Sequence, residues 1–165
     1  MNIAELLVIP ASMYPDHHIV HADGRDVPYE DLQDRVGRIA GALAALGVQA
    51  GDRVAVMQTN TPDVIEALFA VATLGAVFVP LNYRARADEL EHYLRVAEPR
   101  VVLAADRYLP LVLEVVAGLP APMQVVTLDR PAADLPHLPS LLEDAEAAYP
   151  EVQQQAKHEK YGQQV

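Results

Sequence analysis

Residues 28–81 constrain the fold more than any other stretch, because two helix-like and two strand-like patterns alternate there. Apolar residues three or four positions apart predict an amphipathic helix over residues 29–46. A short β-prone run follows at 53–58, an almost wholly apolar helix at 64–74, and a fully apolar strand at 77–81. Glycine or proline ends each pattern, so these are four separate elements.

The same alternation continues downstream. Residues 88–97 and 107–117 are predicted helices, and residues 101–104 and 123–128 are predicted strands. Strands and helices that alternate with short connections are typical of βαβ units with right-handed crossovers. We therefore predict an α/β domain over residues 1–128, with three layers: a mostly parallel sheet and helices on both of its faces.

A small β-hairpin is expected before this sheet. Residues 17–22 alternate weakly, Asp23-Gly24 is a strong turn signal, and residues 25–27 supply the returning strand. A short helix within residues 2–14 precedes the hairpin.

The composition changes after residue 128. Prolines and acids make residues 129–150 a predicted connector, with one short helix around residues 141–148. Residues 151–165 are polar and lack periodicity, so we predict a disordered tail.

Charge and cysteine content exclude several classes of function. The net charge of −11 argues against a nucleic-acid partner, because no basic surface is available to displace phosphate counterions. The chain has no cysteine, which excludes a disulfide framework and a thiolate zinc site. The most apolar run, residues 67–81, is too short for a membrane span, and residues 1–10 make a poor signal peptide. We therefore expect a cytoplasmic protein.

Two features of the helix over residues 29–46 need compensation elsewhere. Gly37 and Gly41 lie four positions apart near its apolar face and cost about 1 kcal/mol each relative to alanine. We expect close packing against a strand to offset that cost. Pro28 precedes the helix and has no side-chain oxygen to cap it, so we expect a helix start that is somewhat weaker or is capped by Asp31 and water.

The glycines of residues 47–51 are the first candidate for a binding site. A phosphate cradle needs glycines after a strand and before a helix, so that free N–H groups face the anion. Here the order is helix then strand, and no lysine follows. We interpret this segment as a turn.

A histidine cluster is the second candidate. His17, His18 and His21 lie close in sequence to Asp16 and Asp23, which suggests a metal site. Alternate side chains of one extended segment leave opposite faces, so they rarely meet at one ion. A surface cluster on an edge strand is the better interpretation.

Carboxylates and hydroxyls complete the set of candidates. Asp88, Glu89 and Glu91 resemble a general acid–base group but fit the solvated face of a helix better. Ser12 and Ser140 lack a nucleophile-elbow context. From the residues we assign no catalytic, cofactor-binding or metal-binding side chain in this chain.

Several segments together resemble the N-terminal part of the adenylate-forming ligases, the superfamily of acyl-CoA synthetases, luciferases and peptide-synthetase adenylation domains. These segments are VPYEDL (27–32), GALAALGVQAGDRVAVMQTNTPDVIEALFAVATLGAVFVPLN (41–82), ADELEHYLRVAEPRVVLA (87–104) and LPSLLED (138–144). The MNIAELL start and the LNYR turn are most similar to bacterial fatty-acyl-CoA synthetases.

The resemblance implies a chemistry for a complete enzyme. Such ligases use Mg-ATP to turn a carboxylate into an acyl-adenylate and then transfer the acyl group to coenzyme A. Their phosphate-binding loop would begin shortly after residue 150, where this chain has Gln153, Gln154 and Gln155 instead. We therefore expect an inactive N-terminal fragment, whose partner is the rest of the ligase or a second subunit that carries it. Asn82 and Arg84 would shape a turn beneath the cleft.

Two alternatives remain open at this point. The chain can be a stand-alone interaction module, monomeric or homo-oligomeric, that keeps the fold without the activity. A flavodoxin-like nucleotide binder ranks last, because the loops after Gln58, Leu81 and Ala104 are not rich in glycine.

Overall fold

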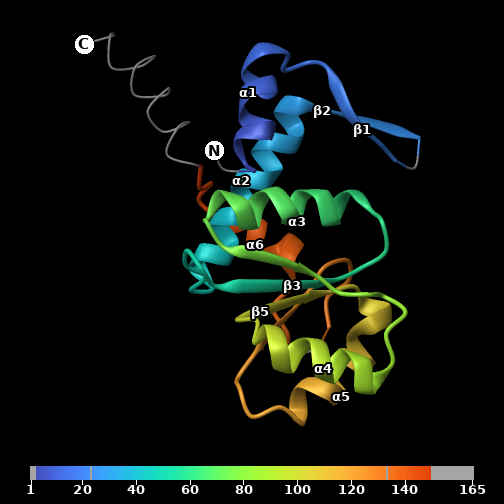
Figure 1. The fold of residues 1–165 in the computed structure, drawn as a ribbon. Helices are drawn as coiled ribbons and strands as arrows, with labels where there is room; N and C mark the ends of the chain where they lie inside the picture. Colours follow the sequence, from blue (N-terminus) through green and yellow to red (C-terminus); the bar gives the residue numbers. More distant parts are fainter. Residues whose placement is uncertain (1–2, 23, 133, 150–165) are drawn as a thin grey trace.

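A four-stranded parallel sheet forms the centre of the molecule (Figure 1). The computed structural model describes residues 3–22, 24–132 and 134–149. The strands lie in the order β4 (Val77–Pro80), β3 (Arg53–Met57), β5 (Val101–Ala104) and β6 (Gln124–Thr127). Val54 of β3 lies opposite Phe78 on one side and Val101 on the other. The predicted parallel sheet is confirmed.

Helices cover both faces of this sheet, because neighbouring residues of each strand point to opposite sides. Val54 and Val56 belong to the buried cluster that includes α2 (Tyr29–Ala45) and α3 (Pro62–Thr73). Ala55 and Met57 belong to the cluster formed with α4 (Ala87–Ala97) and α5 (Leu109–Ala117). Figure 1 shows α3 on one side of the sheet and α4 and α5 on the other. The predicted three-layer α/β fold is confirmed.

The N-terminal elements lie at one end of α2. Helix α1 (Glu5–Met13) packs against α2, and β1 (His18–Ala22) pairs antiparallel with β2 (Arg25–Pro28). Figure 1 shows this hairpin projecting beside α2, away from the main sheet. The predicted hairpin is present.

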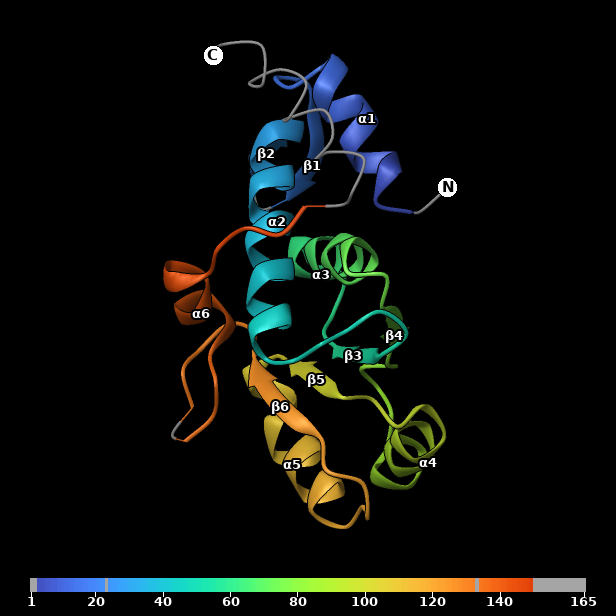
Figure 2. The ribbon, with the colours of Figure 1, turned by 90° about the vertical axis from the view of Figure 1, so that its left-hand side faces the viewer.

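The connector after β6 returns to α2. Its helix, α6 (Leu138–Asp144), begins and ends earlier than the expected span of 141–148. Residues 145–149 then run along α2 (Figure 2). The tail predicted to be disordered lies outside the described residues.

Among the described residues, none of the helices combines the length and the apolar character needed to cross a bilayer.

Candidate functional site

The carboxyl ends of β3 and β5 mark the position where a ligand is expected. The connection after β3 passes through α3 on one face, whereas the connection after β5 passes through α5 on the other. In open parallel sheets this reversal leaves a crevice between the two neighbouring strands, and ligands bind outside their carboxyl ends. The described segments at this edge are residues 58–61, 81–86, 105–108, 128–132 and 134–137, and the third of them contains the short 3-10 helix η1 (Asp106–Tyr108).

Two of these loops bring tyrosines and arginines together. The rings of Tyr83 and Tyr108 lie 6.4 Å apart at an interplanar angle of 49°. The guanidinium of Arg84 lies 5.3 Å from the Tyr83 ring, and that of Arg107 lies 5.8 Å from the Tyr108 ring. Cations at these distances are attracted to the ring faces. Arg84 and Arg107 are both exposed, so each guanidinium is also open to an anionic ligand.

Polar contacts tie the loops after β5 and β6 to each other. The backbone N–H of Asp106 donates to Oδ1 of Asp129 at 2.7 Å. Nε of Arg130 lies 3.2 Å from Oδ2 of Asp106. Asn82 orders the loop after β4, because its Oδ1 accepts a hydrogen bond from the Arg84 N–H at 3.0 Å. These contacts hold the loops at this edge in place around the exposed Arg84 and Arg107.

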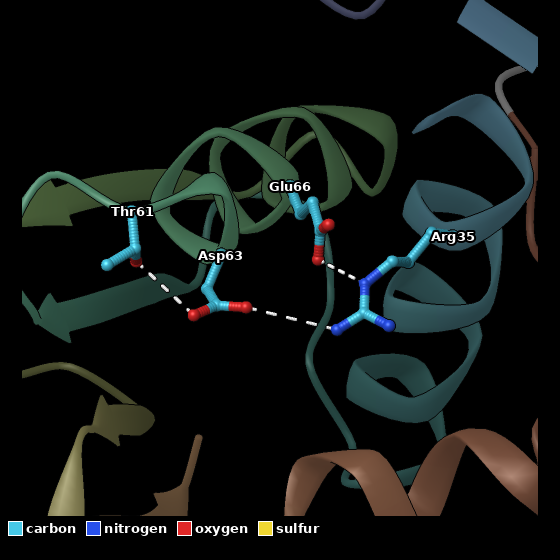
Figure 3. A network of polar contacts seen from close by, with 4 residues as sticks. All are labelled: Arg35, Thr61, Asp63 and Glu66. Carbon is cyan, nitrogen blue, oxygen red and sulfur yellow. Dashed lines mark hydrogen bonds and ion pairs between the residues drawn. The ribbon is translucent and has the colours of Figure 1, made fainter. Parts of the chain in front are cut away.

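A second polar group lies where the loop after β3 enters α3 (Figure 3). Nε of Arg35, from α2, lies 2.5 Å from Oε2 of Glu66. A nitrogen of the same guanidinium lies 3.9 Å from Oδ1 of Asp63, and the Thr61 hydroxyl donates to Oδ2 of Asp63 at 3.2 Å. Arg35 thus joins α2 to the first two turns of α3.

Burial and charge oppose each other at Glu66. Its side chain is only 8% exposed, whereas that of Arg35 is 47% exposed. Burial raises the pKa of Glu66 and outweighs the lowering effect of the hydrogen bond and the charge of Arg35. A cavity of about 450 Å³ borders this group, and its lining includes the acids Asp26 and Asp31.

The glycine segment of residues 47–51 lies at the opposite, amino-terminal edge of the sheet. Gly47 and Gly51 both have left-handed φ angles, +85° and +84°. The Asp52 N–H donates to the carbonyl oxygen of Gln49 at 3.0 Å and closes a turn, and the Gly51 N–H donates to the carbonyl oxygen of Gly75 at 3.0 Å. Its position before β3 agrees with the interpretation as a turn.

Two of the three histidines, His18 and His21, lie on the exposed hairpin and contact the same carboxylate, that of Asp26, whereas His17 precedes the hairpin and lies apart from them. Nδ1 of His21 lies 2.5 Å from Oδ1 of Asp26, and Nδ1 of His18 lies 3.5 Å from Oδ2. The hydrogen bond with His21 is the main reason why the pKa of Asp26 is lowered. His17 instead stacks on Tyr14 at 5.0 Å. Asp23 lies outside the described residues.

Four of the remaining candidates have structural partners, and Asp88 is exposed on α4. Glu89 accepts a hydrogen bond from the Arg86 N–H at 2.9 Å, and Glu91 pairs with Arg95. The Ser12 hydroxyl donates to the carbonyl oxygen of Ile9 at 2.7 Å. Ser140 Oγ lies 2.9 Å from Nδ1 of His137 at the start of α6. Within the described residues, no three histidine, aspartate or glutamate side chains form a group suited to a metal ion.

Sequence patterns did not reveal the Tyr83–Tyr108 contact or the Arg35–Glu66 pair. One signal was available for the pair: Glu66 is the acid inside an otherwise apolar predicted helix, and a buried carboxylate requires a cation. The partner itself is 31 positions away and depends on how α2 crosses α3.

Comparisons with known proteins agree on one family. The sequence model described as AMP-binding enzyme matches residues 9–161. Feruloyl-CoA synthase of Amycolatopsis sp. is 37% identical over 134 residues, which cover 81% of this chain and 27% of the relative. The 3-oxocholest-4-en-26-oate–CoA ligase of Rhodococcus rhodochrous is 30% identical over 129 residues, or 78% of this chain and 23% of the relative.

Solved structures show the same likeness in three dimensions. A Rhodopseudomonas palustris protein described as a long-chain-fatty-acid CoA ligase superposes with a TM-score of 0.83 at 30% identity. The superposition covers 92% of this chain and 38% of that protein. A Mycobacterium tuberculosis fatty acyl CoA synthetase gives a TM-score of 0.79 at 26% identity, over 92% of this chain and 30% of that one. The chain thus spans about a quarter of the length of the two curated relatives, the feruloyl-CoA synthase and the 3-oxocholest-4-en-26-oate–CoA ligase.

Proposed function

This chain belongs to the AMP-binding enzyme family, and we propose that it is the N-terminal part of an acyl-CoA ligase. The complete enzyme would use ATP to convert a carboxylate into an acyl-adenylate and then form a thioester with coenzyme A. The match over residues 9–161 carries this proposal, together with relatives that are named as CoA ligases. We include in it a cytoplasmic location and a partner in the rest of the ligase, on the same polypeptide or on a second chain.

The carboxyl edge of the sheet is the part of this chain that would face the substrates. Arg84 and Arg107 are exposed there and are held against the tyrosine rings of their own loops. Exposed guanidinium groups are suited to phosphate, and both ATP and coenzyme A carry phosphates. The wall that this chain contributes therefore binds or steers phosphate groups.

The described residues do not by themselves fit a magnesium site. Their acids do not gather into a group of three that could hold a metal ion, and Asp106 is paired with Arg130. The carboxylates that hold Mg²⁺ would therefore come from the rest of the enzyme. In the same proposal, residues 1–128 form the α/β body and residues 129–150 connect it to that remaining part.

A comparison of two samples tests the proposal. The first is the purified 165-residue chain, and the second is the natural polypeptide that contains these residues, isolated from its own cells. Each sample is incubated with ATP, Mg²⁺, coenzyme A and a panel of carboxylates that includes ferulate, benzoate and long-chain fatty acids. Carboxylate-dependent pyrophosphate release and the intact mass are then measured.

We expect no turnover by the 165-residue chain, and turnover by the natural polypeptide at a mass well above 18.0 kDa or in complex with a second chain. Turnover by the short chain alone would show that it is not an inactive part. A natural polypeptide of 18.0 kDa without a partner or activity would support the stand-alone interaction module instead.

A further inference from the structure

Gly37 and Gly41 lie one helical turn apart on α2, under the segment Ala145–Tyr149. Figure 2 shows the chain after α6 crossing α2. The backbone N–H of Ala148 donates a hydrogen bond to the carbonyl oxygen of Gly37 at 2.9 Å. The segment therefore contacts the backbone of α2 itself rather than the ends of its side chains. The packing partner expected for these glycines was a strand, and this prediction was wrong: an extended segment outside the sheet takes that place.

Any larger residue would fill the space that the segment occupies. A Cβ atom at Gly41 would lie 1.9 Å from the carbonyl oxygen of Glu146 and 2.9 Å from its carbonyl carbon. A Cβ atom at Gly37 would lie 2.9 Å from Cε1 of Tyr149 and 3.3 Å from the carbonyl oxygen of Ala148. The contact at Gly41 is with backbone, which cannot rotate away, whereas the nearest contact at Gly37 is with a side chain that can move.

The segment is anchored at both of its ends. It follows α6, which packs against α2 through the buried Leu138. At the other end, Tyr149 lies where α1, α2 and α3 meet, beside Leu7 and Phe69. Between these anchors the chain crosses the surface of α2 in the groove above the two glycines.

We infer that residues 145–149 are a strap, and that Gly37 and Gly41 exist as glycines to seat it on α2. The strap fixes the point and the direction in which the chain leaves the α/β body. In this respect the inference rests on the proposed function, because the polypeptide beyond residue 149 would then lead into the rest of the ligase. The seat and its occupant, however, are both part of this chain and can be tested in it.

The substitution Gly41→Ala tests the strap, because helix propensity alone and a seated strap predict opposite effects on stability. Glycine is a poor helix former, so Gly41→Ala should raise the Tm by roughly 2–4 °C if nothing packs on that position. If the strap is seated there, the added methyl group displaces it. Amide hydrogen exchange at Ala148, read together with the Tm, separates the two possibilities.

The experiment uses the 165-residue chain without ATP or coenzyme A. We expect Gly41→Ala to lower the exchange protection of the Ala148 amide at least about tenfold, while amides in β3 and β5 keep theirs. Gly37→Ala should cause a smaller loss, since the Tyr149 ring can move. Ala44→Gly, on the exposed side of α2, is the matched control: it should lower the Tm and leave Ala148 protected.

Two results would overturn the inference. One is a higher Tm in Gly41→Ala with unchanged protection at Ala148; the other is a larger loss in Gly37→Ala than in Gly41→Ala. If Gly41→Ala does not fold, the Ala148 amide is measured in the original chain and in Gly37→Ala instead. If this amide exchanges in the original chain as fast as in an unstructured peptide, the strap is not seated on α2. None of these readings depends on ligase activity, so a failed ligase assay leaves them intact.

Discussion

Glu66 destabilises the folded chain, because its carboxylate loses hydration when α3 packs against α2. It lies in the second turn of α3 among apolar residues and is almost fully buried, and the nearby guanidinium of Arg35 only partly compensates for its lost hydration. The folded-state pKa of Glu66 is therefore raised above the value of a solvated glutamate. The folded chain holds this proton more tightly than the unfolded chain does.

This raised pKa predicts a pH-dependent effect of Glu66→Gln. As the pH rises from the ordinary glutamate pKa to the raised one, the original chain loses stability, since its unfolded state releases the proton more readily. Glutamine does not titrate. The free energy of unfolding of the variant, minus that of the original chain, should therefore increase across this window by about 1.4 kcal/mol for each pH unit that separates the two pKa values. Urea unfolding at a series of pH values measures the difference.

Glu91→Gln is the control for this prediction. Glu91 also pairs with an arginine, Arg95, but both side chains are about half exposed. Its substitution should change the free energy of unfolding by no more than about 0.5 kcal/mol. A Glu66→Gln difference that stays constant with pH would contradict the raised pKa.

At the scale of elements, α2 is the helix on which most of the others depend. It contacts α1, α3, α6 and the hairpin, and it carries the strap. Its start also differs from the expectation that Asp31 and water cap it. The N–H groups of Tyr29 and Glu30 donate to the carbonyl oxygens of His17 and Pro15, at 3.0 and 3.1 Å. The chain before the hairpin thus supplies the acceptors that Pro28 lacks.

Leu43→Asp tests the buried face of α2. Leu43 is fully buried in the seam between α2 and the sheet, as its position in the apolar periodicity indicated. The substitution loses about 1.5–3 kcal/mol of apolar burial and adds the cost of desolvating a carboxylate. We expect an unfolded chain, seen as the loss of a cooperative thermal transition in circular dichroism.

Ala44→Asp is the matched control, since Ala44 is the next residue and is exposed. It should fold and melt within a few degrees of the original chain. A cooperative melt of Leu43→Asp at the original temperature would mean that the buried face of α2 has been assigned incorrectly.

The same helix shows what the sequence can and cannot predict. Its span, 29–46 expected and Tyr29–Ala45 observed, follows from local periodicity, and so do the strands and their parallel pairing. Other features depend on a partner that only the fold brings near. These are the contact of the strap with Gly41, the hydrogen-bond acceptors for Tyr29 and Glu30, and the contact between Tyr83 and Tyr108. The resemblance placed the turn of Asn82 and Arg84 beneath the cleft, but the contact between Tyr83 and Tyr108 was missed, because the two tyrosines come from loops that are far apart in sequence.

The molecule as a whole leaves an unusual amount of apolar surface on α1. Ile3, Leu6, Ile9 and Met13 are between 51% and 61% exposed. Leu6, Ile9 and Met13 are spaced three or four positions apart and lie along one side of α1, Ile3 lies just before the helix, and the buried Leu7 and Ala11 lie on another side. Apolar residues that gather in this way promote association, whereas single exposed ones are ordinary.

We therefore predict that the 165-residue chain associates reversibly and that Leu6→Lys suppresses this. Sedimentation equilibrium over a wide concentration range should give a mean mass that rises above 18.0 kDa for the original chain and stays near 18.0 kDa for the variant. Leu6 is 57% exposed, so a lysine at this position should leave the fold and the Tm unchanged. Leu113→Lys on α5, where the leucine is 40% exposed, is the control and should associate like the original chain. A monomeric original chain at every concentration would mean that the stripe on α1 is too small to hold two copies together, because about 1,000 Å² is needed for a stable contact.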